Sequence, residues 1–121
     1  MAKEPFQQRV LEWLTACFYP SACIDRKERV HRFLEEALEL AQAAGCSRED
    51  VDRLADYVFA RPVGRPELEV GGVMVTLAGL CAASGINMDA AADCELKRNW
   101  SRMTAIRHKQ ANRPIGSPLP Q

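Results

Sequence analysis

Glutamates gather on one predicted helix in the first half of the chain. Within segment 32–40, RFLEEALEL, Glu36 and Glu39 stand three residues apart, and Glu35 and Glu39 stand four apart. Residues at these spacings share one flank of a helix, so the three carboxylates can face the same way. Carboxylate oxygens without thiolate or imidazole partners suit a hard cation such as Mg²⁺. The same spacing also fits a solvated face on which Arg32 pairs with Glu36.

A further acidic residue opens the most apolar segment of the chain. Glu69 directly precedes the run 70–83. A carboxylate at this position is costly unless it reaches solvent, a cation or the positive end of a helix dipole. If the two predicted helices face each other across a bundle, Glu69 and the first cluster could hold one metal between them.

The order of these acids resembles that of the MazG-like nucleoside triphosphate pyrophosphohydrolases. The E-x-x-E of Glu36 to Glu39 and the later segment 69–77, EVGGVMVTL, are similar to the family pattern E-x-x-E followed by E-x-x-D. Segment 95–102 is similar to the closing K-x-x-N-like stretch of the family. The resemblance covers roughly residues 29–102 and implies an all-α bundle.

The resemblance implies hydrolysis of a nucleoside triphosphate between its α and β phosphates, which yields a monophosphate and pyrophosphate. Mg²⁺ is the implied cofactor, with Mn²⁺ as a substitute. Glu36, Glu39 and Glu69 are then the metal ligands, and Glu35 is the catalytic residue that orients the attacking water. A bound divalent ion neutralises phosphate charge and lowers the pKa of water.

The resemblance also implies substrate contacts on the last predicted helix. Lys97 and Arg98 would contact phosphates, Asn99 would contact the nucleotide, and Arg102 would add a cation at the mouth of the site. These residues could equally form an ordinary basic helix face.

Gly72 stands where the family pattern has aspartate. Three explanations are open: another acid replaces the missing ligand, with Glu67, Asp93 and Glu95 as candidates; the site uses fewer ions; or catalysis has been lost. The last explanation defines an alternative function, a catalytically degenerate helical homo-oligomer that binds a nucleotide or a protein.

The bulk composition narrows the classes of partner. Sixteen basic residues balance sixteen acidic ones, so no net field attracts nucleic acid or an anionic membrane, although segment 98–113 is locally basic. The apolar run 70–83 is shorter than the roughly 20 residues that cross a bilayer. Five cysteines without a C-x-x-C pair indicate neither a disulfide framework nor a zinc site. We expect a cytoplasmic protein without membrane or nucleic-acid partners.

Apolar residues recur at helical spacing through most of the chain, which predicts an all-α bundle of about five helices. Ser47 and Asn87 are expected to cap helices, and Gly45 to end one. We expect one domain over residues 1–112 and a proline-rich tail over 113–121. The predicted helices span residues 5–18, 25–44, 47–59, 67–83 and 87 to beyond 106.

The fourth predicted helix, 67–83, is apolar on nearly every side. Such a helix usually lies at the centre of a bundle, so we expect it to be buried. One thin layer of helices cannot cover it on all sides, so we expect a homodimer or homotetramer.

Overall fold

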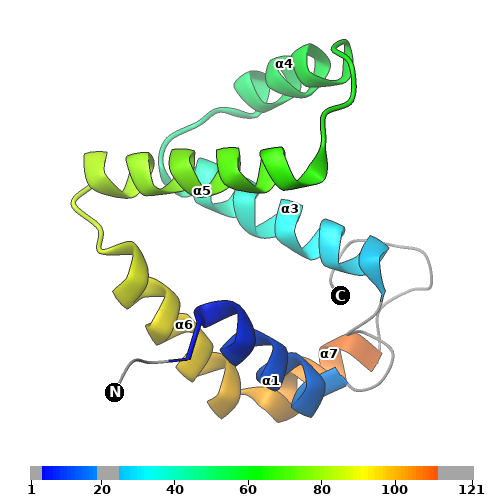
Figure 1. Cartoon of the computed structure of the whole chain (residues 1–121), viewed down its shortest axis with the longest axis vertical. Coiled ribbons are helices and arrows are strands. Elements are labelled where there is room, and N and C mark those ends of the chain that lie inside the picture. Colours follow the sequence, from blue (N-terminus) through cyan, green and yellow to red (C-terminus); the bar gives the residue numbers. More distant parts are fainter. Residues whose placement is uncertain (1–3, 19–24, 112–121) are drawn as a thin grey trace. The chain divides into compact units, whose positions relative to one another are not determined.

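The computed structural model describes residues 4–18 and 25–111, and within these ranges the chain is helical without any strand (Figure 1). The all-α prediction is therefore confirmed. The predicted tail, 113–121, lies outside the described residues. Six helices are described: α1 (Phe6–Phe18), α3 (Arg26–Ala43), α4 (Arg48–Phe59), α5 (Pro66–Ala83), α6 (Met88–Ser101) and α7 (Met103–Ala111).

Local signals set the helix ends where the sequence predicts them. The Asp50 N–H donates to Ser47 Oγ at 3.1 Å, and the Ala90 N–H donates to Asn87 Oδ1 at 2.8 Å. Both side chains satisfy backbone donors that have no partner within the helix. Gly45 follows α3 with a φ of 94°, a left-handed conformation that glycine adopts without a steric penalty.

The last predicted helix is divided into α6 and α7, with a turn at Arg102. Ser101 Oγ donates to the Arg98 carbonyl at 2.7 Å. The Arg102 N–H is shared between the carbonyls of Arg98 and Asn99, at 3.1 and 3.2 Å. A serine that bonds back to its own helix bends it, and this explains why periodicity alone missed the break.

The chain groups into two compact units, which we describe separately. Unit 1 comprises Met1–Ala37 and Ala92–Gln121, and unit 2 comprises Leu38–Ala91. Unit 1 also includes residues 113–121 of the predicted tail, and the predicted single domain over residues 1–112 stays a prediction.

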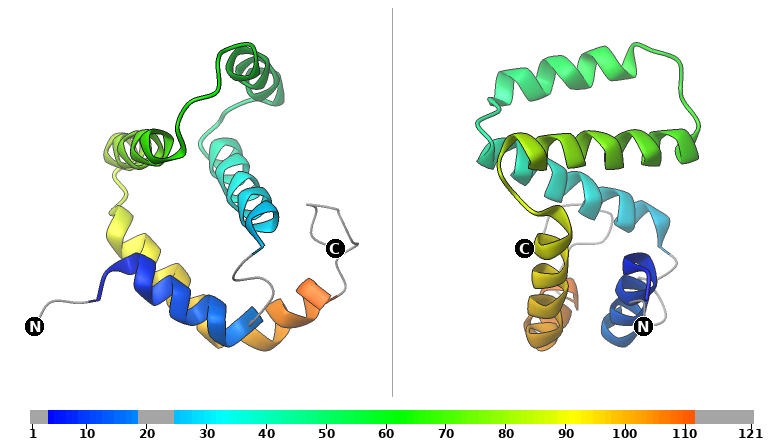
Figure 2. Two further views of the ribbon diagram at one scale, coloured as in Figure 1. Left: turned by 45° about the vertical axis from the view of Figure 1, so that its right-hand side comes forward. Right: turned by 60° about the vertical axis from the view of Figure 1, so that its left-hand side comes forward.

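Unit 1 contains a small hydrophobic core. In this unit α1 runs alongside α6 and α7 (Figure 2). Arg9 on α1 also forms an ion pair of 2.6 Å with Asp93 on α6. The centre of the core is Trp13, Cys17 and Leu96, against which Val10, Leu14, Phe18, Met103 and Ile106 pack.

Unit 2 contains no comparable core among its described side chains. Its helices α4 and α5 run in opposite directions on either side of a short loop (Figure 2). Cys81 is the one buried residue of this unit. Only 6% of the residues of α5 are buried. No described helix of unit 2 covers α5, so the expectation that α5 is buried is not met within this unit.

Helix α5 has the length and apolar composition of a membrane-spanning helix. It has 18 residues with a mean hydropathy of 1.3, and it alone among the described helices is long and apolar enough to cross a bilayer. Core helices of soluble proteins share this length and composition, so both features fit a bilayer and a protein core equally.

Candidate functional site

A polar pocket lies within unit 1, formed by residues of α1, α3, α6 and α7 and of the turn at Arg102. Its volume is about 310 Å³, which lies at the lower end of the range for small-molecule sites. We call it the unit 1 pocket. It is lined by Trp13, Phe18, Arg29, Arg32, Glu35, Glu36, Glu95, Arg98, Asn99, Arg102, Ile106 and Lys109.

The charged groups of the unit 1 pocket are mainly basic, with five cationic side chains against three carboxylates. Arg32 Nη1 lies 3.3 Å from Glu35 Oε1, and Arg98 Nη2 lies 3.0 Å from Glu95 Oε1. The whole unit carries the same bias, with twelve Lys and Arg against eight Asp and Glu. This concentration of positive charge favours a polyanionic ligand.

Two of the pocket arginines also contact a buried carboxylate. Glu28, in the first turn of α3, is 4% exposed, and its Oε1 lies 3.5 Å from Arg29 Nη2 and 3.6 Å from Arg32 Nε. The Arg29 guanidinium also lies 5.8 Å from the centroid of the Phe18 ring. Together these contacts tie the arginines to the helix surface beside the pocket.

The pocket brings together five of the residues predicted from the sequence. Glu35 and Glu36 reach it from α3, Arg98 and Asn99 reach it from α6, and Arg102 lies at the turn that follows α6. Lys97, which was predicted to contact substrate, is exposed and does not line the pocket.

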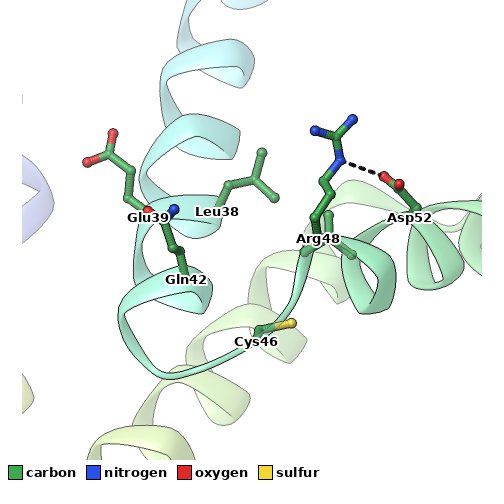
Figure 3. A pocket seen from close by; sticks show the side chains of 7 residues that line it. Leu38, Glu39, Gln42, Cys46, Arg48 and Asp52 are labelled. Atoms are coloured by element: carbon green, nitrogen blue, oxygen red, sulfur yellow. Dashed lines mark hydrogen bonds and ion pairs between the residues drawn. The ribbon is translucent and has the colours of Figure 1, made fainter.

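Glu39 lies apart from the unit 1 pocket. It lines a cavity of about 530 Å³ within unit 2, together with Leu38, Gln42, Cys46, Arg48, Val51 and Asp52. Figure 3 shows the Glu39 carboxylate turned away from the Arg48–Asp52 ion pair, whose closest N–O distance is 3.0 Å. No residue of α5 lines this cavity, so it does not join Glu39 to Glu69.

Glu69 folds back toward the loop that precedes α5. Its Oε1 lies 2.9 Å from the point that a Cβ on Gly64 would occupy, so the carboxylate uses space that only glycine leaves open. Within residues 4–18 and 25–111, no group of three or more His, Cys, Asp or Glu side chains is placed to hold a metal. Glu36 belongs to unit 1, whereas Glu39 and Glu69 belong to unit 2, so the ligand set of these three residues stays a prediction.

The three candidate replacements for the missing aspartate lie in different surroundings. Glu95 lines the unit 1 pocket, Asp93 pairs with Arg9, and Glu67 is exposed in the first turn of α5. A Cβ at Gly72 would meet nothing within 4 Å, so a larger side chain has room there.

Sequence reasoning did not assign Arg29, Arg32, Ile106 and Lys109 to the site, and one signal could have found two of them. Glu95, Arg98, Asn99 and Arg102 follow the spacing i, i+3, i+4 and i+7, and Ile106 and Lys109 continue this series on the same helical face. Lys97 is off that face. By contrast, nothing in the sequence links Glu28 to the pocket, because its closeness depends on how the helices pack.

Comparison with known proteins adds no relative. No family model matches the chain, and no curated protein or solved structure matches it significantly.

Proposed function

We propose that the chain is a Mg²⁺-dependent nucleoside triphosphate pyrophosphohydrolase whose substrate binds in the unit 1 pocket. The observation that carries this proposal is the gathering of five cationic side chains, three glutamates and one asparagine around a single cavity. A polyphosphate needs cations along its chain, whereas its hydrolysis needs carboxylates beside them.

The charges of the pocket support phosphate binding. Arg29, Arg32, Arg98, Arg102 and Lys109 surround it, and arginine matches phosphate oxygens with paired N–H donors. Among the described residues, Arg102 and Lys109 form no ion pair. These two side chains are therefore the best placed to neutralise the substrate.

The carboxylates of the pocket fit a hard divalent cation that arrives with the nucleotide. Mg²⁺ in such sites keeps several waters and is held by one or two carboxylates and the substrate phosphates, so a cage of three protein ligands is not required. Glu35 and Glu36 would hold the ion, which would supply charge neutralisation and an activated water. Glu39 and Glu69 are not needed for this arrangement.

The apolar side of the pocket suits the nucleoside. Trp13, Phe18 and Ile106 line it beside the charged residues. Trp13 and Phe18 make an edge-to-face contact with ring centroids 5.6 Å apart, so the two rings support each other.

Pyrophosphate release from a panel of nucleoside triphosphates with Mg²⁺ tests this function. We expect release from the wild type and a loss of roughly 10- to 100-fold in Glu36→Gln, which keeps the shape and removes the charge. Glu49→Gln on α4 is the matched control, because Glu49 is exposed and pairs only with Arg53. Equal activity in both variants would place the site elsewhere.

A second pair of variants separates the pocket from the sequence-based assignment. Arg102→Gln and Lys97→Gln remove one positive charge each from nearby positions, but only Arg102 lines the pocket. We expect KM for the nucleotide to rise in Arg102→Gln and to stay unchanged in Lys97→Gln. The reverse result would contradict the pocket.

Gly72, which stands where the family pattern has aspartate, favours one alternative, a protein that binds a nucleotide without hydrolysing it. Nucleotide binding without pyrophosphate release from any nucleotide would support it. Gly72→Asp extends the test, because the position has room for a side chain and aspartate is no worse in a helix than glycine. A gain of hydrolysis in Gly72→Asp would show that the missing carboxylate limits catalysis.

We further propose that α5 packs against a second copy of the chain. Large apolar side chains are exposed on α4 and α5, and a stable interface of roughly 800 Å² per partner needs such an apolar centre. They are Leu54, Tyr57, Val58, Phe59, Leu68, Val70, Val73, Met74 and Val75.

A second copy fits this surface better than a lipid bilayer does. Unit 2 carries eight Asp and Glu against four Lys and Arg, so an anionic membrane would repel it. Helix α5 is about 27 Å long at 1.5 Å per residue and has Glu67 and Glu69 in its first turn. Its apolar part is therefore shorter than the roughly 30 Å hydrocarbon core.

Sedimentation velocity tests this assembly. We expect the wild type to be oligomeric, Val75→Asp to dissociate, and Val63→Asp to behave as the wild type, because Val75 is on α5 whereas Val63 is fully exposed in the loop before it. A monomeric wild type at 100 µM, or its binding to lipid vesicles, would overturn the assignment.

A further inference from the structure

The buried carboxylate of Glu28 has no role in the proposed hydrolysis, yet it lies beside the pocket that performs it. It is the only buried charged side chain in the described part of the chain, with 4% of its surface exposed. A buried carboxylate is costly unless cations and donors surround it. The neighbours that offset this cost include Arg29 and Arg32, both of which line the unit 1 pocket.

The distances from Glu28 to Arg29 and Arg32 leave guanidinium N–H donors available to a ligand. Glu28 Oε1 lies 3.5 Å from Arg29 Nη2 and 3.6 Å from Arg32 Nε, which is longer than the roughly 2.7–2.9 Å of a charge-assisted hydrogen bond. Glu28 therefore fixes where the guanidinium groups lie without using up their N–H donors.

Each arginine has a second support that completes its placement. Arg29 lies over the Phe18 ring, and Arg32 Nη1 lies 3.3 Å from Glu35 Oε1 on the next turn of α3. Glu28 is itself placed by its helix, because its N–H donates to Asp25 Oδ1 at 3.1 Å. The cluster thus forms a chain of contacts from the start of α3 to the pocket.

We propose that Glu28 is a positioning residue that holds Arg29 and Arg32 ready for the phosphate oxygens of the ligand. Long arginine side chains lose about 2 kcal/mol of rotamer freedom when they are fixed. Glu28 orders them before the ligand arrives, so binding does not bear that cost. This inference rests on the proposed function, because it assumes that the pocket receives a polyphosphate.

The direction in which anion affinity changes when Glu28 loses its charge separates positioning from simple electrostatics. Removal of a negative charge beside two arginines makes the pocket more positive, so electrostatics alone predicts tighter binding of an anion. Loss of positioning predicts weaker binding. Glu28→Gln keeps the shape and removes the charge, and we expect it to bind inorganic pyrophosphate about tenfold more weakly, with kcat for the nucleotide unchanged at saturation.

Calorimetric titration with pyrophosphate and with a Mg²⁺-nucleotide tests this proposal on the full chain. Glu49→Gln is the control for a generic loss of one carboxylate. A double-mutant cycle adds a readout that a merely structural role would not move. In an Arg29→Met and Arg32→Met background, Glu28→Gln should have no further effect on affinity.

The outcomes distinguish the two proposals. A wild type that binds neither probe overturns the proposed function and, with it, the role of Glu28. A wild type that binds both probes, with Glu28→Gln binding equally well or more tightly, overturns the positioning role alone. If Glu28→Gln does not fold, Glu28→Asp decides: it keeps the charge but shortens the reach, so wild-type affinity would overturn the proposal and weaker binding would support it.

Discussion

Units 1 and 2 are built from similar helices but are stabilised in different ways. Unit 1 joins its helices through the core of Trp13, Cys17 and Leu96 and through the Arg9–Asp93 ion pair. Unit 2 has well-formed helix ends but leaves the apolar side chains of α4 and α5 exposed. The comparison shows that capping and periodicity are sufficient to form helices, whereas packing needs complementary surfaces that one copy of unit 2 does not supply.

The two units also differ in net charge. Unit 1 has an excess of four basic side chains and contains the polar pocket, whereas unit 2 has an excess of four acidic ones. The zero net charge of the whole chain conceals this division. The proposed ligand binding and the proposed self-association therefore fall to different parts of the sequence.

The largest expected effect separates the two units by stability. Leu96→Ala should lower the free energy of unfolding by about 2–5 kcal/mol, because it opens a cavity in the core of unit 1. Leu54→Ala on α4 should change it by less than about 0.5 kcal/mol in the monomer, because Leu54 is 58% exposed. Urea denaturation at low protein concentration measures both. Similar losses in the two variants would contradict the contrast between the units.

Helix capping should matter most where packing is weakest. Ser47→Ala removes the acceptor for the Asp50 N–H and should destabilise α4 by about 1 kcal/mol. Without a core to hold it, α4 should fray locally, and amide hydrogen exchange will detect this before global unfolding. Unchanged exchange rates in α4 would mean that tertiary contacts, rather than the cap, hold this helix.

Ion pairs should follow the same division with smaller effects. Arg9→Met breaks the contact with Asp93 between α1 and α6, and we expect a loss of about 1 kcal/mol because both side chains are partly buried. Arg48→Gln breaks the exposed pair with Asp52 and should have almost no effect. Thermal denaturation of both variants checks this order, and equal shifts would contradict it.

Thiol reactivity gives the finest comparison. Burial raises the pKa of the Cys17 thiol, so iodoacetamide should modify it slowly at pH 8, whereas the less buried Cys46 in unit 2 should react faster. Because the folded pKa of Cys17 is raised, its contribution to stability is present below the unfolded pKa and is lost as the pH rises toward the folded value. Peptide mapping by mass spectrometry measures both rates, and faster modification of Cys17 would reverse the comparison.

The sequence by itself determined most of the secondary structure. The Ser47 and Asn87 caps and the Gly45 stop depend on short-range hydrogen bonds and backbone freedom, which a single sequence reveals. Helical spacing likewise predicted that Glu35, Glu36 and Glu39 share one flank, whereas the family resemblance named Asn99 and Arg102, on and just after α6, as substrate contacts. It missed the break at Arg102, where a serine side chain competes with the helix.

Only the tertiary structure decided which of these groups meet. It placed Glu35, Glu36, Asn99 and Arg102 around one cavity, left Lys97 outside it, and brought buried Glu28 against two pocket arginines. It assigned Glu36 to unit 1 and Glu39 and Glu69 to unit 2, so their role as one ligand set stays a prediction. The physical reason is range: a helix forms from contacts within four residues, whereas a site depends on packing between segments far apart in the chain.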